Sequence, residues 1–176
     1  MSKEQISNEL MKLIKKAQID EEQGAILYEF MAKKEKNEEN KKILMQMSKD
    51  EKRHAEVWKK ITNKNLKPSK LSILKFKFLT MIMGITFVIK TMQKKENLAQ
   101  HEYEKMKEEL PEAAKMLEDE RIHEKNLYNM NMKIFGERVK QTLKETGWTQ
   151  KRLAESYLLI FVTVKAFYRL LWMKVK

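Results

Sequence analysis

An internal repeat limits the folds that are open to this chain. The sequence DEKRH at 50–54 recurs as DERIH at 119–123, an offset of 69 residues. Two of the three histidines therefore stand three residues after a glutamate that itself follows an aspartate. A chain with such a repeat is expected to build its fold from two similar units.

A second pair of residues repeats upstream of these motifs. Glu21 precedes Tyr28 by seven residues, and Glu96 precedes Tyr103 by the same seven, at an offset of 75. The two offsets differ by six residues, which a shorter connection in the second half explains. Each half of the chain thus contains a lone glutamate, a tyrosine two helical turns later, and then Glu-x-x-His.

Few residues in this sequence interrupt helices. There are 4 Gly and 2 Pro among 176 residues, and Lys, Glu, Leu and Met dominate, which favours an all-α protein. The length fits one domain, or one domain with an appendage. Because a duplicated helix pair is a natural source of a four-helix bundle, we predict a bundle over residues 1–136. Residues 137–176 are predicted to form a basic, apolar helical extension.

Apolar residues at three- and four-residue steps predict the individual helices. The expected helices cover residues 4–36, 40–62, 71–92 continuing into 93–109, 111–134, 138–146 and 150–175. The third is expected to bend or break near Gly84. A linker at 63–70 is closed by Pro68, Gly147 begins a second break, and Thr149 is expected to cap the last helix.

Helical periodicity places the repeated polar residues among the buried ones. Positions i and i+3 share one face of a helix, so the glutamate and the histidine of each Glu-x-x-His motif can reach the same point. Both motifs, and both lone glutamates, fall in phase with the apolar stripes of their helices. The predicted inward-facing set is Glu21, Glu51, His54, Glu96, Glu120 and His123.

Four carboxylates in an apolar core would be prohibitively costly unless they were neutralised. Two divalent cations supply the balancing charge, and two imidazoles complete an oxygen and nitrogen shell suited to iron or manganese. The chain has no Cys, which excludes disulfides, thiolate sites, iron–sulfur clusters and cysteine nucleophiles. One glutamate from each of two helices, with Glu-x-x-His from two others, is the metal-binding pattern of ferritin-like bundles.

The same periodicity predicts the surroundings of two tyrosines and of the third histidine. Tyr28 and Tyr103 are predicted to reach back and donate hydrogen bonds to the metal ligands. His101 lies off the face of Glu96 and is expected to be solvated. The competing interpretation of the repeat is a pair of surface helices with salt-bridged glutamates and with histidines at their edges.

With these residues, the chain resembles the rubrerythrin branch of the ferritin-like superfamily. DEEQGAILYEFMAKK and SKDEKRHAEVWKK resemble its first helix pair, and TMQKKENLAQHEYEKM and LEDERIHEKNL resemble its second. LKFKFLTMIMGITFVIKTM is similar to the rubrerythrin-type domains fused to vacuolar-iron-transporter-like membrane domains. The resemblance covers residues 10–135 and implies two Fe ions, two Mn ions or a mixed Fe/Mn pair, held by the same six ligands.

The resemblance also implies an activity. It is that of a di-iron or iron/manganese oxidoreductase that reduces hydrogen peroxide or dioxygen while oxidising Fe(II), in iron handling or oxidative-stress defence. Rubrerythrins proper carry a four-cysteine rubredoxin module, whereas this chain has no Cys, so an external donor or substrate Fe(II) must supply the electrons. The residues after 136 are too few for a transporter domain. For the further carboxylates that rubrerythrins often carry near the metals, the nearest candidate is Glu102, which is out of phase with Glu96.

The net charge of +12 is concentrated in two apolar segments. Residues 59–95 carry 10 basic and no acidic side chains, and residues 137–176 carry 9 basic against 3 acidic ones. Basic and apolar character together fit an anionic membrane surface at least as well as nucleic acid. Nucleic acid is disfavoured, because the basic residues are mostly Lys and the aromatic residues stand in apolar runs.

Two stretches, 71–92 and 153–173, approach the length of a membrane span, but charged residues interrupt both. They could pack against each other or across a homodimer interface, lie on a membrane with lysines at the headgroups, or span it. The rival function is accordingly a non-catalytic, metal-binding helical module that docks on a membrane or an acidic partner. The first residues lack the apolar core of a secretory signal. We therefore expect a cytoplasmic homodimer, with peripheral attachment to the inner face of the membrane as an alternative location.

Overall fold

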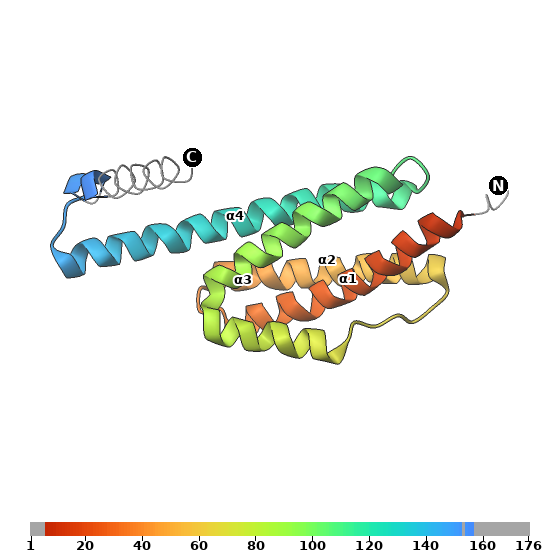
Figure 1. The fold of residues 1–176 in the computed structure, drawn as a ribbon, viewed down its shortest axis with the longest axis horizontal. Helices are drawn as coiled ribbons and strands as arrows, with labels where there is room; N and C mark the ends of the chain where they lie inside the picture. Colours follow the sequence, from red (N-terminus) through yellow and green to blue (C-terminus); the bar gives the residue numbers. More distant parts are fainter. Residues whose placement is uncertain (1–5, 153, 157–176) are drawn as a thin grey trace, which may run out of the picture. The chain divides into compact units, whose positions relative to one another are not determined.

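The computed structural model describes residues 6–152 and 154–156, which are almost entirely α-helical and contain no strand. Its long helices are α1 (Asn8–Lys34), α2 (Glu38–Thr62), α3 (Lys70–Met106) and α4 (Pro111–Thr146), as Figure 1 shows. The predicted all-α, ferritin-like class is confirmed. The chain divides into two units, residues 1–132 and 133–176. The metal centre described below lies in the first unit, and the predicted domain boundary at 136 stays a prediction.

Local sequence explains where the first helices begin and end. The hydroxyl of Ser7 accepts a hydrogen bond from the backbone N–H of Leu10 at 3.1 Å, so α1 begins four residues later than predicted. Asn37 caps α2 in the same way, accepting from two backbone N–H groups at 3.1 and 3.0 Å. Asn63, in the left-handed conformation with φ 50°, ends α2 and starts the predicted linker.

The predicted bend in the third helix is confirmed at Gly84. Its φ of 76° and ψ of 172° are not helical, and they fall where only glycine is comfortable. Figure 1 shows the chain of α3 changing direction there. Residues 85–106 carry the buried Val88, Ile89 and Glu96, whereas Thr80 is the only fully buried residue described in 70–83.

The predicted separation of 111–134 from 138–146 is wrong, because α4 runs through both segments without a break. A glycine within a helix costs only about 1 kcal/mol relative to alanine, so Gly136 does not end it. The break at Gly147 is confirmed, with φ 65°. Thr149 accepts from the backbone N–H of Arg152 at 3.2 Å, as a cap should. Residue 153 and residues 157–173 of the second apolar stretch lie outside the described residues.

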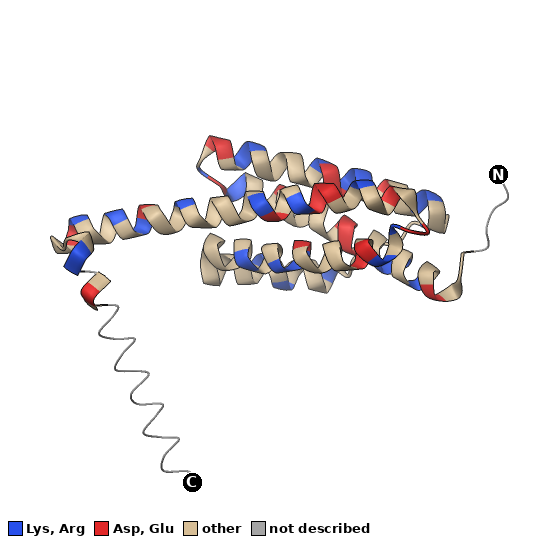
Figure 2. Ribbon diagram, turned by 90° about the horizontal axis from the view of Figure 1, so that it is seen from above, with Lys and Arg blue, Asp and Glu red and all other residues tan. Residues whose placement is uncertain are grey.

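The interior of the first unit has an apolar part and a polar part. Figure 2 shows acidic and basic residues interspersed along most of the helices, but residues 70–95 of α3 carry only basic ones. One apolar cluster of fully buried residues comes from α1, α2, α3 and α4 and includes Ile14, Trp58, Tyr103, Met106 and Ala113. Next to it, buried glutamates and histidines occupy the centre of the helix bundle. This second group contains all six residues that the sequence predicted as metal ligands.

Candidate metal centre

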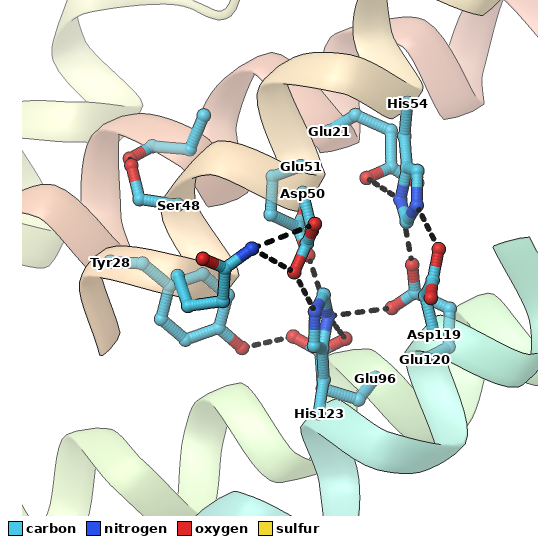
Figure 3. Close-up of polar contacts among 12 residues, drawn as sticks. Glu21, Tyr28, Ser48, Asp50, Glu51, His54, Glu96, Asp119, Glu120 and His123 are labelled. Carbon is cyan, nitrogen blue, oxygen red and sulfur yellow. Dashed lines mark hydrogen bonds and ion pairs between the residues drawn. The ribbon is translucent and has the colours of Figure 1, made fainter. Parts of the chain in front are cut away.

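The structure brings the six predicted ligands together. All of them are 4% exposed or less: Glu21, Glu51, His54, Glu96, Glu120 and His123. Figure 3 shows them converging from α1, α2, α3 and α4. They form two groups, each with ligand atoms within 4.8 Å of one another: Glu21 with His54 and Glu120, and Glu51 with Glu96, Glu120 and His123. Glu120 belongs to both groups.

Each histidine turns its Nδ1 atom toward the centre. His54 Nδ1 lies 3.2 Å from an oxygen of Glu120 and 3.4 Å from one of Glu21. His123 Nδ1 lies 3.2 Å from Glu51 and 3.6 Å from Glu96. The two motifs therefore exchange partners, because each histidine is next to the glutamate of the other motif.

The Nε2 atoms of the two histidines face the aspartates that precede the glutamates. His54 Nε2 lies 3.0 Å from Asp119, and His123 Nε2 lies 3.6 Å from Asp50. Arg53 contacts both aspartates at 3.0 Å. At His54, the hydrogen bond to Asp119 favours the tautomer that leaves the Nδ1 lone pair free for a metal, whereas His123 Nε2 makes no hydrogen bond among the described residues. Helical periodicity did not predict these contacts, but the recurrence of an aspartate before both Glu-x-x-His motifs was a signal for them in the sequence.

The two predicted tyrosines also cross between the halves. The Tyr28 hydroxyl donates to Glu96, and the Tyr103 hydroxyl donates to Glu21. Both tyrosines are fully buried. Trp58 donates from its indole nitrogen to the Tyr103 oxygen at 3.2 Å. Each lone glutamate is thus held by the tyrosine of the opposite repeat.

Because Gly24 has no side chain, it leaves room for the Glu51 carboxylate. A Cβ atom at this position would lie 2.2 Å from Glu51 Oε2 and 2.9 Å from Glu51 Cδ. Such contacts are far too short, so even alanine would displace the Glu51 carboxylate. Gly24 stands one turn after Glu21, and α1 can therefore approach α2 closely at this level.

Several buried atoms at the centre fit a bound metal, because nothing else satisfies them. Among the described residues, these atoms have no hydrogen-bond partner: Glu21 Oε2, Glu51 Oε1, Glu120 Oε1, His54 Nδ1 and His123 Nδ1. Buried polar atoms without a partner are rare and costly in folded proteins. Carboxylate oxygens and imidazole nitrogens of this kind suit iron or manganese. The residues present therefore fit a pair of metal ions.

Burial and mutual repulsion favour protonated carboxyl groups at this centre. Burial, followed by repulsion from Glu120, raises the pKa of Glu21 well above its usual range. Burial and repulsion from Glu21 do the same to the pKa of Glu51. Burial, with hydrogen bonding to Glu120, raises the pKa of Glu96 to about 8. Metal ions would replace protons that these groups otherwise retain.

At the two histidines and Glu120, the same cluster favours the charged form of the side chain. Burial would lower the pKa of His123, but its contacts with Glu120 and Glu51 raise it. Burial would also lower the pKa of His54, and its contacts with Glu120 and Asp119 raise it. Burial and repulsion from Glu51 push the pKa of Glu120 upward, yet its close polar contacts with Glu96 and with both histidines bring it below the usual value.

A cavity of about 290 Å³ between α1 and α3 reaches the centre. All four predicted glutamate ligands line the cavity, together with the apolar side chains of Met92, Leu98 and Ala99. At its mouth, the half-exposed ammonium of Lys16 pairs with Asp20 and Glu102. The cavity has room for a small oxidant.

Two other side chains lie away from the centre. His101 is exposed, as expected, and its Nδ1 lies 2.6 Å from the carbonyl oxygen of Asn97. Glu102 pairs with Lys16 at the cavity mouth and does not join the ligand cluster. The helical phase of Glu102 relative to Glu96 predicts this position outside the cluster.

Comparison with known proteins adds a family. The model of the rubrerythrin family matches residues 12–119. No curated protein and no solved structure matched the chain. The family match ends just before Glu120, while the structure places Glu120 and His123 in the same cluster as the ligands within the match. Rubrerythrin-type domains generally hold di-iron sites, and the buried glutamates and histidines found here could hold metal. The match covers more than half of the 176 residues of this chain. This chain therefore belongs to the rubrerythrin family.

Proposed function

We propose that this chain is a di-iron oxidoreductase that reduces hydrogen peroxide or dioxygen while oxidising Fe(II). The observation that carries the proposal is the set of buried carboxylate oxygens and imidazole nitrogens that converge without partners of their own. A manganese ion could replace one or both iron ions, because the ligands suit either metal. The biological role would be iron handling or defence against oxidative stress in the cytoplasm.

The two groups of ligand atoms support two metal positions. Glu21 and His54 would hold one ion, and Glu96 and His123 would hold the other. Glu120 belongs to both groups and would help to hold both ions. Glu51 lies only in the group with Glu96, Glu120 and His123, and it would help to hold the second ion.

When bound, the metal pair supplies the electrons that reduce the oxidant. The chain contributes the environment for this reaction. The hydroxyls of Tyr28 and Tyr103 orient the lone glutamates, and Asp119 orients the His54 ring through its contact with Nε2. The cavity between α1 and α3 admits a small molecule beside the glutamates, and the low exposure of the ligands keeps bulk water away.

The experiment begins with anaerobic loading of the protein with Fe(II). We expect about two iron ions per chain, and we expect their oxidation to accompany consumption of added peroxide or dioxygen. Oxidant consumption is followed with an electrode, and metal content by elemental analysis. Running peroxide and dioxygen in parallel identifies the preferred oxidant.

Glu51→Ala combined with Glu120→Ala should abolish metal uptake and oxidant consumption. The matched control is Glu118→Ala, which removes an exposed carboxylate of α4 that pairs with Arg121. Wild-type protein that takes up no metal would end the proposal. Uptake of metal without oxidant consumption would instead support the rival function, a non-catalytic metal-binding module.

A further inference from the structure

The first part of α3 exposes an unusual amount of apolar surface. Seven large apolar side chains of residues 70–83 are between 45% and 75% exposed: Leu71, Leu74, Phe78, Leu79, Met81, Ile82 and Met83. Phe87, just past the bend, is also exposed. Contiguous apolar patches of this kind on a protein surface mark sites where a partner or a membrane binds. We call these seven residues the α3 apolar face.

Most of these side chains share one side of the helix. Leu71, Leu74, Phe78, Met81 and Ile82 follow one another at steps of three, four, three and one, which keeps them within a single stripe. Within that stripe lies the exposed Lys75, and Lys70 is exposed at its edge. A lysine in such a place can lay its methylene chain along apolar surface and raise its ammonium into water or headgroups.

The opposite side of the same segment is anchored to α1. Gln23 donates to the hydroxyl of Ser72 at 2.9 Å. The ammonium of Lys77 lies 5.3 Å from the centre of the Phe30 ring, a favourable cation–π distance. Thr80 is buried. These contacts fix the rotation of the helix, so that the apolar face is directed away from the bundle.

The charge around the face selects its partner. Residues 59–95 contain ten basic and no acidic side chains. Lys67 is neutralised by Glu22 at 2.9 Å, but Lys70 and Lys75 have no ion pair among the described residues. A second copy of the chain would bring lysines against lysines. An anionic lipid surface instead accepts both the apolar side chains and the lysines.

This segment does not fit a membrane-spanning role. α3 is the one helix of the described chain that is long and apolar enough to cross a bilayer, with a mean hydropathy of 1.8 over its most apolar window. The straight part, residues 70–83, is about 21 Å long at 1.5 Å per residue, against a hydrocarbon core of ~30 Å. Beyond Gly84, the helix carries Val88, Ile89 and Glu96 into the bundle.

We propose that residues 70–83 of α3 lie on the surface of an anionic phospholipid membrane, with the α3 apolar face in the boundary between headgroups and acyl chains. The lysines at and within the stripe contact the headgroups. The bundle and its metal centre stay outside the bilayer. In a cell, the anionic inner leaflet would be the matching surface.

The test is vesicle flotation of the full chain, with vesicles of phosphatidylcholine alone and of phosphatidylcholine mixed with phosphatidylglycerol. We expect the protein to float with the mixed vesicles and to bind them more weakly as salt is raised. Phe78→Asp should weaken binding at least about tenfold, because it removes an apolar ring that would enter the lipid boundary and it adds repulsion from the anionic headgroups. Each of Lys70→Gln and Lys75→Gln should weaken it about fivefold.

The matched control is Ile122→Asp, which adds the same charge at a half-exposed apolar position on α4. It should leave flotation unchanged, and circular dichroism should show that all variants remain folded. Equal binding of wild type and Phe78→Asp would overturn the proposal. So would equal binding to both vesicle types, resistance of the bound protein to alkaline carbonate extraction, or a dimer that Phe78→Asp dissociates in the absence of lipid.

Discussion

The metal centre and the α3 apolar face depart from the usual distribution of residues in opposite directions. In the metal centre, six ionisable side chains lie in the interior, where such groups are seldom found unpaired. On residues 70–83, large apolar side chains lie in water, and Met81 is 75% exposed. Each departure indicates something outside the chain: cations for the carboxylates, and lipid for the apolar side chains.

The two departures differ in what they do to folding. Buried carboxylates act on the stability of the chain itself, because the folded state must accommodate their charge or keep them protonated. Exposed apolar residues change little between the folded and unfolded chain, so they act on solubility and association instead. Metal and pH should therefore change stability, and substitutions on the α3 apolar face should not.

Removal of metal is expected to have the largest effect on stability. A ligand that binds only the folded state stabilises it by about 4 kcal/mol when its free concentration is a thousandfold above Kd. Thermal unfolding before and after treatment with a chelator should therefore show a marked fall in the melting temperature of wild type. Glu51→Ala with Glu120→Ala should show no fall, and an unchanged melting temperature in wild type would contradict the metal centre.

The stability of the metal-free protein should decrease as pH rises from about 5 to about 8. The pKa of Glu96 is about 8 in the folded chain and about 4.3 in an unfolded one, so the folded state binds more protons across this window and loses stability as they dissociate. The raised pKa of His123 acts in the same direction. The lowered pKa values of Glu120 and Asp119 act in the opposite direction, at acidic pH. Urea unfolding at pH 5 and at pH 8 measures the net change in the free energy of unfolding, which should be on the order of a few kcal/mol. A rise in stability over this window would mean that the carboxylates are not buried together.

Gly24→Ala should separate metal affinity from helix stability. The new Cβ would displace the Glu51 carboxylate, and loss of ligand geometry of this kind typically costs about 10–100-fold in metal affinity. Alanine is the better helix former by about 1 kcal/mol, so the metal-free variant should be no less stable than wild type. Metal titration with unfolding of the same samples tests both effects. Gly136→Ala, in α4 with open space around it, is the matched control and should leave metal affinity unchanged.

Phe78→Asp should have the smallest effect on stability. Surface substitutions away from special features usually change the free energy of unfolding by less than about 0.5 kcal/mol, and this ring is 60% exposed. Urea unfolding of the variant should match wild type, and its solubility should improve. A strongly destabilised variant would show that the α3 apolar face is buried against another part of the chain.

Much of the metal centre could be predicted from sequence, because helical periodicity alone decides which residues share a face. That was enough to place all six ionisable residues inside and to put Glu102 outside. The crossed contacts could not be predicted in the same way. Whether Tyr28 reaches Glu96 or a nearer glutamate depends on how the helix pairs pack, and no local pattern encodes that packing.

The helix boundaries show the same limit. Ser7 is an N-cap residue that composition alone did not distinguish from earlier polar residues. The expected separation of 111–134 from 138–146 does not occur, because Gly136 is tolerated within α4. The bend at Gly84, by contrast, was predictable, since a glycine within a long apolar run is the natural place for positive φ.

The most direct test of the metal centre is anomalous scattering from crystals of the full chain, recorded at the iron and manganese absorption edges. We predict two adjacent peaks, one beside Glu21 and His54 and the other beside Glu96 and His123, with Glu120 between them. The edge at which each peak appears identifies the metal. Crystals of iron-loaded protein with no peak at these residues, or with peaks only elsewhere, would contradict a dinuclear centre in this chain.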